Sequence, residues 1–313
     1  MSRQNRLEWF GALKRAQAPA VRAGHDLIVE LEIDRDMRNR LQLATMTYIG
    51  EGLGMTGNLG SPESFMNVVD ERFTELYHRT PNGVILPKRE FEESFNALQG
   101  LFGSYVRSLR IEHLLSDGFA PLTVRLARGT SDPSADKRPF ASTKTHVDLW
   151  SGDPADTVTL FVPIMGDIEQ STVDFFHPPD DLESTLLKPL SGYDEGMRLL
   201  GDLPRYDLRM KHGYAYVMDA VVPHRTVNLG GGPRVTLQVQ FRRATTAAER
   251  ASIEAVCDAG RLSHFIPRDE WFSLGTTKRM QFIDTFADAK RGVFTSRPYN
   301  ERIYSLADVE RAV

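Results

Sequence analysis

The chain has 313 residues, of which 41% are hydrophobic and 26% are charged, which is typical of a globular protein with a sizeable core. The net charge of −4 and the lack of a long basic run argue against nucleic acid as a partner, because phosphate binding needs clustered Lys and Arg. The single cysteine, Cys257, excludes an internal disulfide and a thiolate-rich metal site.

The N-terminal stretch lacks the apolar run of a signal peptide, and no stretch approaches 18 uncharged apolar residues. We therefore expect no membrane span. Together with the single cysteine, this favours a cytoplasmic location.

Residues 1–118 are predicted to be mainly helical. Ser61 followed by Pro62 is a typical helix start, with a hydroxyl cap and then proline in the first turn. Apolar and aromatic residues then recur at helical spacing, first after Pro62 and again over residues 88–115. One short strand is predicted at residues 27–33.

Residues 119–243 change to short segments that are rich in β-branched and aromatic residues and are bounded by Gly, Pro or Asp. This pattern is typical of strands in a barrel or sandwich. The segments read PLTVRLARG, DTVTLFVPI, STVDFF, GYAYVMDA and RVTLQVQFR. Two polar loops, 129–139 and 177–207, lie between them, and at least one is expected to act as a lid.

Residues 244–313 are predicted to return to helix. Thr246 and Glu249 form a plausible capping box, and Phe282, Ile283 and Phe286 indicate a later amphipathic helix. No Pro/Gly/Ser-rich linker divides the chain, so we expect one α+β domain over residues 1–313, with a β core between two helical flanks. A separate N-terminal helical domain is the alternative.

A candidate metal site begins with His146 and Asp148. Residues two apart on an extended segment point the same way, so the pair would present an imidazole and a carboxylate together. A lone H-x-D occurs by chance in many chains and needs a third ligand. His224 follows a predicted strand about 80 residues later. Two imidazoles and one carboxylate on one face of an ion are typical of non-haem Fe(II) oxygenases.

A second pair, Arg234 and Thr236, lies on the strand after His224. An arginine fork beside a hydroxyl suits a buried carboxylate. An arginine that points into a β barrel needs such a partner, because an unpaired buried charge is costly.

In order and spacing, the H-x-D pair, the distal His and the R-x-T triplet resemble the Fe(II)/2-oxoglutarate-dependent dioxygenases over about residues 120–243. The segment from Gly213 to His224 looks most like the phytanoyl-CoA-hydroxylase-like branch. The resemblance implies a double-stranded β-helix (jelly-roll) core with helical flanks.

The resemblance also implies roles for individual residues. His146, Asp148 and His224 would hold Fe(II), and Arg234 with Thr236 would bind the far carboxylate of 2-oxoglutarate. O2 would be consumed, and succinate and CO2 released. Hydroxylation is the default outcome, with desaturation, ring closure and epimerisation as variants.

A polar, ionisable small molecule is the expected substrate, because the candidate pocket residues are rich in Arg and Lys and offer no continuous apolar surface. The candidate contacts are Arg125, Arg128, Lys144, Trp150 and His177. For each of them the alternative is an ordinary surface salt bridge or simple packing. The sequence does not indicate an oligomeric state.

Two other classes remain open. A cupin-like metal-dependent isomerase or dioxygenase would share the β core and the metal ligands but would not need Arg234 and Thr236. A non-catalytic β-sandwich that binds a ligand would leave His146 and His224 far apart in space.

Overall fold

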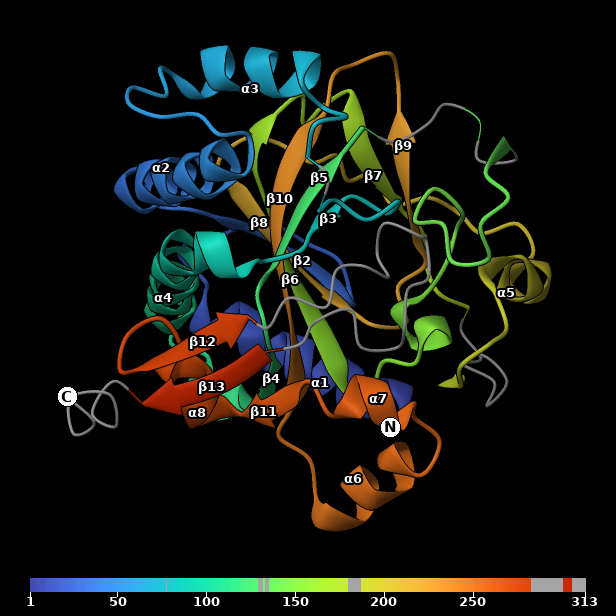
Figure 1. The fold of residues 1–313 in the computed structure, drawn as a ribbon. Coiled ribbons are helices and arrows are strands. Elements are labelled where there is room, and N and C mark those ends of the chain that lie inside the picture. The colour runs from blue at the N-terminus through green and yellow to red at the C-terminus, as the bar shows by residue number, and fades with distance from the viewer. Residues whose placement is uncertain (77, 129–131, 133–134, 180–186, 283–300, 306–313) are drawn as a thin grey trace.

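The computed structural model describes the chain except residues 77, 129–131, 133–134, 180–186, 283–300 and 306–313 (Figure 1). The described part mixes α-helices with antiparallel sheets, as the α+β prediction requires. None of its helices has the length and apolar character that a membrane span needs.

A nine-stranded sheet forms the centre of the molecule. Its long run places β10 beside β6, β6 beside β8 and β8 beside β2, all antiparallel. On the other side of β10, β5 pairs with its first half and β4 with its end. The strands are β1 (Val21–Gly24), β2 (Ile28–Glu32), β3 (Val84–Ile85), β4 (Leu115–Phe119), β5 (Thr123–Ala127), β6 (Thr157–Gly166), β8 (Tyr214–Asp219), β10 (Arg234–Arg243) and β11 (Phe265–Pro267).

A second, two-stranded sheet pairs β7 (Ser171–Phe175) with β9 (His224–Asn228). In Figure 1 it lies to the right of the large sheet, while the helices α2 (Arg35–Gly52) and α4 (Glu92–Ser108) lie to the left. The five β-rich segments predicted between residues 119 and 243 are confirmed as β5, β6, β7, β8 and β10.

The alternation of residues along β10 separates the core from the site. Val235, Leu237 and Val239 are buried apolar residues of the main core. Arg234, Thr236, Gln238 and Gln240 alternate with them and therefore point to the opposite face of the sheet. Arg234, Gln238 and Gln240 of this row line the cavity described below, and Thr236 lies between Arg234 and Gln238 on the same face.

The N-terminal region contains the expected helices and more strand than expected. The helices are α1 (Arg3–Ala16), α2, α3 (Pro62–Glu71) and α4, with short 3-10 turns η1 (Arg89–Phe91) and η2 (Glu112–Leu114). Ser61 caps α3 and Pro62 opens it, and the predicted strand is present as β2. The mainly helical prediction missed β1, β3 and β4. The polar and glycine residues of β4, LSDGF, conceal its strand character.

The C-terminal region corrects the prediction of helices. The capping box is confirmed at α6 (Ala247–Glu254), and the short helices α7 (Ala259–Leu262) and α8 (Arg268–Ser273) follow. However, β11 joins the large sheet, and β12 (Lys278–Phe282) pairs with β13 (Glu301–Ser305). Phe282 thus lies in a strand, and Ile283 and Phe286 lie outside the described residues.

Candidate metal centre

A backbone bridge brings His146 and His224 together across the sequence. The His146 amide donates to the His224 carbonyl over 3.0 Å, and the His224 amide donates to the His146 carbonyl over 2.8 Å. The two imidazole centroids are 4.3 Å apart. This contradicts the ligand-binding sandwich in which the two histidines would be distant from each other.

Both imidazoles are oriented by a backbone carbonyl. The Nδ1 of His146 lies 2.8 Å from the Lys144 carbonyl, and the Nδ1 of His224 lies 3.0 Å from the Val222 carbonyl. Because Nδ1–H donates to these oxygens, Nε2 is the ring nitrogen left to ligate a metal. Burial, and then the neighbouring His224, hold the pKa of His146 well below its ordinary value.

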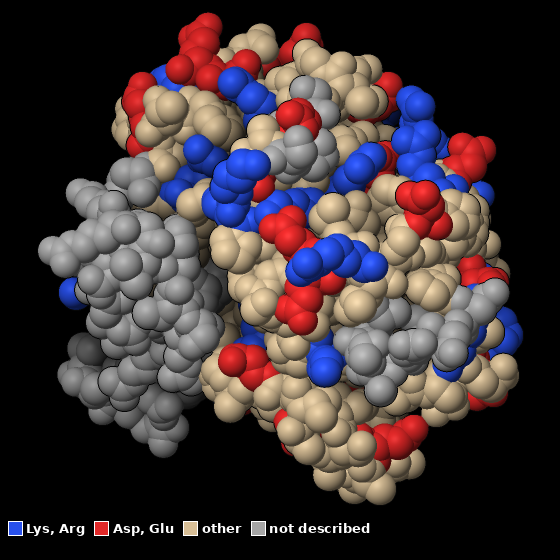
Figure 2. Space-filling view, turned by 90° about the vertical axis from the view of Figure 1, so that its right-hand side faces the viewer, with Lys and Arg blue, Asp and Glu red and all other residues tan. Residues whose placement is uncertain are grey.

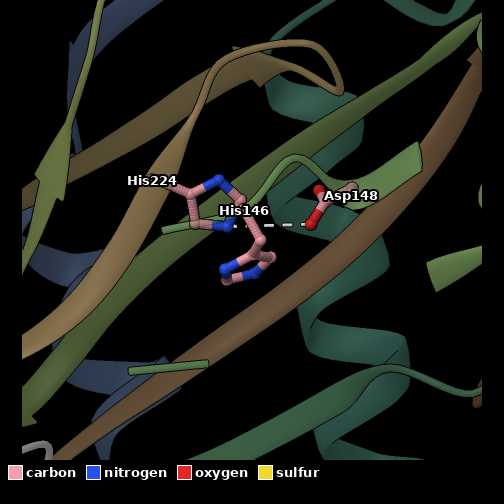
Figure 3. A group of neighbouring side chains, drawn as sticks. All are labelled: His146, Asp148 and His224. Atoms are coloured by element: carbon pink, nitrogen blue, oxygen red, sulfur yellow. Dashed lines mark ion pairs between the residues drawn. The ribbon is translucent and has the colours of Figure 1, made fainter. Parts of the chain in front are cut away.

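Asp148 completes a triad. His146 lies in a β-bridge and Val147 is extended, as expected for the H-x-D pair, whereas Asp148 itself opens the 3-10 helix η4 (Asp148–Ser151) and does not continue a strand. The Thr159 hydroxyl donates to Asp148 Oδ2 over 2.9 Å, and Asp148 Oδ1 lies 3.7 Å from His224 Nε2. One ligand atom from each of the three residues lies within 4.8 Å of the others (Figure 3).

Arg234 lies fully buried, and no acidic side chain among the described residues pairs with it. Its Nη1 donates to the carbonyls of Ser171 and Thr172, whereas Nε and Nη2 have no hydrogen-bond partner in the described part of the chain. The hydroxyl of the neighbouring Thr236 is also buried and unpartnered. Burial, and then the charge of Arg125, lower the pKa of Arg234 to about 9. An anion that accepts from these groups would relieve this arrangement.

The triad and Arg234 line one cavity of about 650 Å³. This volume is within the range of small-molecule sites in enzymes. Residues of both sheets form its walls, including Phe161 of β6 and Val173 and Phe175 of β7. Further aromatic side chains reach it from the end of β4, from a loop and from the start of a helix, namely Phe119, Phe140 and Tyr193.

A polar network in the cavity wall was not predicted. Gln240 Nε2 donates to the buried carboxylate of Asp153 over 2.6 Å, and the Arg261 guanidinium donates to both Asp153 and Gln240. Burial, the largest cause, raises the pKa of Asp153. Gln240 could have been found from the period-two row that contains Arg234. Arg261 carries no such signal, because it reaches the cavity from α7 in the C-terminal region.

Of the five predicted substrate contacts, Arg125 lines the cavity. It lies opposite Thr236 in the strand register, and its Nη1 donates to the Asn82 carbonyl. Arg128 lies just beyond the end of β5, pairs with Asp70 and is not part of the cavity wall.

The other three candidates also lie outside this wall. Lys144 pairs with Asp194 over 2.6 Å, because the backbone at Lys144 is a turn and not the strand that would aim it like His146. Trp150 is fully buried. His177 packs on Tyr206, with ring centroids 3.7 Å apart.

Figure 2 views the molecule from the right-hand side of Figure 1. Lys and Arg are interspersed with Asp and Glu among the side chains coloured on this face. No large patch of one sign is apparent there. The expected absence of a nucleic-acid partner stays a prediction.

The chain matches no protein-family model and no curated protein sequence. Among solved structures it is similar to the non-haem, α-ketoglutarate-dependent carbocyclase SnoK from nogalamycin biosynthesis, with 10% identity, a TM-score of 0.45, and 80% of this chain and 92% of that chain covered. It is also similar to the non-haem, α-ketoglutarate-dependent epimerase SnoN from nogalamycin biosynthesis, with 14% identity, a TM-score of 0.39, and 75% of this chain and 82% of that chain covered.

A third similar structure is an N-substituted L-amino acid dioxygenase from Burkholderia ambifaria, with 14% identity, a TM-score of 0.33, and 75% of this chain and 91% of that chain covered. The first two belong to the enzyme class that the sequence motifs indicate. At such low identities and scores, function has to be inferred from the side chains of the site. The finer resemblance to the phytanoyl-CoA-hydroxylase-like branch stays a prediction.

Proposed function

We propose that this protein is an Fe(II)- and 2-oxoglutarate-dependent oxygenase that oxidises a small molecule. The observation that carries the proposal is the buried Arg234, which lacks an acidic partner and lies in the same cavity as the His146–Asp148–His224 triad. The triad alone would fit many metal enzymes. The added anion site is what a dicarboxylate co-substrate needs.

The donor set fits Fe(II). Two imidazoles and one carboxylate on one face of an ion suit non-haem iron and leave positions open for other ligands. The Lys144 and Val222 carbonyls orient the two imidazoles, and Thr159 holds the carboxylate, so the ligands are positioned by the fold. When bound together, Fe(II), 2-oxoglutarate and O2 supply an oxidant that removes hydrogen from a C–H bond and leave succinate and CO2.

Arg234 and Thr236 are proposed to bind the far carboxylate of 2-oxoglutarate. The Nε and Nη2 atoms of Arg234 can donate as a planar fork, and the Thr236 hydroxyl can add a third hydrogen bond. Arg125 lies beside Thr236 and close enough to lower the pKa of Arg234, so it can contact the other carboxylate or an anionic substrate.

A double-stranded β-helix is the proposed architecture of the core. The cavity takes wall residues from both the large sheet and the β7–β9 sheet, as expected when two antiparallel sheets enclose a site. The aromatic side chains between the sheets restrict water around the metal, which strengthens charged interactions there. Hydroxylation of a polar substrate is the proposed default reaction.

The cupin-like alternative would need an anionic substrate to pair with Arg234, because it uses no 2-oxoglutarate. The deciding experiment is anaerobic addition of Fe(II) and 2-oxoglutarate to the metal-free protein. A weak visible charge-transfer band is expected. If iron binds but 2-oxoglutarate does not, the proposal is wrong and the cupin-like class replaces it.

The substrate is then sought by measuring succinate release. The screen should cover amino acids, sugars, nucleosides and acyl conjugates. A compound that is turned over should stimulate succinate release well above the uncoupled background.

A further inference from the structure

The segment that carries two of the three metal ligands has little regular structure. Between Ala141 and Ser151 the backbone forms turns, one isolated bridge at His146 and the short helix η4. A sheet ladder therefore does not hold His146 and Asp148 in place. Their geometry depends on neighbouring side chains, and helix α5 (Tyr193–Leu200) supplies several of these.

The ring of Tyr193 lies flat against the imidazole of His146. The centroids are 4.1 Å apart and the planes differ by 13°. Tyr193 is buried, and its amide donates to the Pro139 carbonyl over 2.8 Å, which fixes the start of α5 beside the metal site. The stacked Tyr193 ring and the hydrogen bond to the Lys144 carbonyl together restrict rotation of the His146 imidazole.

The next residue of α5, Asp194, acts on the same ligand through Lys144. Asp194 accepts from Lys144 Nζ over 2.6 Å. Lys144 is also the residue whose carbonyl accepts from His146 Nδ1. The ion pair therefore anchors the backbone that orients the imidazole.

A third contact reaches the segment of Asp148. Gly196 packs against the ring of Trp150, which lies in η4 together with Asp148. A Cβ at Gly196 would overlap that ring, so only glycine lets α5 lie this close. The Leu190 amide, just before α5, donates to the Trp150 carbonyl over 3.1 Å.

We propose that the first turn of α5 is a positioning element for the metal ligands, in which Tyr193 sets the orientation of His146 and Gly196 sets the position of η4. This inference rests on the proposed metal site and adds residues to it that touch neither metal nor co-substrate. It assigns a function to α5, which lies in the segment that the sequence marks as a polar loop.

The test is metal affinity of the purified full-length protein. Metal-free protein is titrated anaerobically with Co(II) in place of Fe(II), and the visible absorption of Co(II) reports the coordination geometry. Tyr193→Leu removes the flat ring and should weaken Co(II) binding by about 10- to 100-fold, the range seen when groups that orient metal ligands are lost. Tyr193→Phe keeps the ring and should bind like wild type.

The same helix offers a matched control. Leu199 is 51% exposed on α5, and Leu199→Ala should leave both the affinity and the spectrum unchanged. Gly196→Ala should weaken binding and change the Co(II) spectrum, because α5 must move away from Trp150.

The outcomes separate this inference from the proposed function. Wild type that binds neither Co(II) nor Fe(II) would overturn both. Wild-type affinity and spectrum in Tyr193→Leu, or an equal loss in Tyr193→Phe, would overturn only the positioning element. Loss of the folded circular dichroism spectrum in metal-free Tyr193→Leu would assign Tyr193 a general structural function and would also overturn it.

Discussion

Both ends of strand β10 bury arginines, and Arg234 at the start differs in its partners from Arg242 near the end. Arg242, at the end of the strand, donates from Nε and Nη2 to Asp156 and from Nη1 to Glu254. Within the described residues, Arg234, at its start, donates from Nη1 alone and to backbone carbonyls. Each side chain is at most 1% exposed, so burial does not distinguish them.

Their pKa values follow the same division. Burial lowers the pKa of Arg242, but the hydrogen bonds and charge of Asp156 outweigh it and raise the pKa above its ordinary value. At Arg234, burial and Arg125 both act in the lowering direction, and no acidic group opposes them.

A buried arginine that stabilises a fold is paired with an acidic side chain of the same protein, because an unpaired buried charge costs several kcal/mol. A buried arginine that binds an anionic ligand must lack such a partner, because the ligand takes its place. By this criterion Arg242 belongs to the scaffold and Arg234 belongs to the site. The following predictions test this division, starting with the change that should remove the site altogether.

The largest effect is expected from the metal ligands. His146→Ala or His224→Ala removes an imidazole that the fold has already oriented, so metal uptake should be greatly weakened and turnover lost. Fe(II) content after anaerobic loading and succinate release measure the two effects. Full turnover in both variants would contradict the metal assignment.

The scaffold end of β10 should show its effect in stability. Arg242→Met removes the partner of the Asp156 carboxylate, which is 1% exposed, and should lower the free energy of unfolding by about 3–5 kcal/mol. Urea denaturation measures this loss. In the folded fraction, 2-oxoglutarate should bind as in wild type. A selective loss of 2-oxoglutarate affinity would mean that the two ends are not separate in function.

Arg234→Ala should have the opposite profile. Loss of a buried, charge-assisted pair should cost about 2–5 kcal/mol of binding free energy, or roughly 30-fold to several thousand-fold in 2-oxoglutarate affinity. Arg234→Lys should restore only part of it, because an ammonium cannot reproduce the planar fork. The measurement is titration of the anaerobic Fe(II) protein with 2-oxoglutarate.

Two controls accompany this experiment. Fe(II) binding should survive in Arg234→Ala, because Arg234 is not a ligand. The free energy of unfolding of the metal-free variant should be no lower than that of wild type, because the substitution removes a buried cation that lacks an acidic partner. Wild-type affinity for 2-oxoglutarate in Arg234→Ala would contradict the dioxygenase proposal.

The comparison also explains which parts of the site the sequence could predict. Arg234, Thr236 and the strands around them follow a period of two, which determines the face on which each side chain lies. His146 and His224 could be paired because residue type limits the choice of ligands. In each case a local rule was sufficient.

Other parts of the site depend on tertiary structure that no local rule contains. Lys144 is two residues from His146, yet a turn aims it at Asp194. Arg261 reaches Asp153 from α7, and Tyr193 reaches His146 from an insertion. Sequence distance from a motif is therefore a poor guide to which side chains enter the cavity.

The smallest predicted effect concerns the hydroxyl beside Arg234. Thr236→Val keeps the shape of the side chain but removes an oxygen that is buried and has no partner in the described structure. If that oxygen donates to 2-oxoglutarate, the affinity should fall by about 1 kcal/mol, or roughly fivefold, as for a typical single hydrogen bond. Thr236→Ser retains the hydroxyl and should bind 2-oxoglutarate more tightly than Thr236→Val.

The metal-free Thr236→Val protein should be at least as stable as wild type, because an unsatisfied buried polar group is replaced by a methyl group. If Thr236→Val binds 2-oxoglutarate normally but unfolds more easily, Thr236 stabilises the fold, like Arg242, and does not bind the ligand.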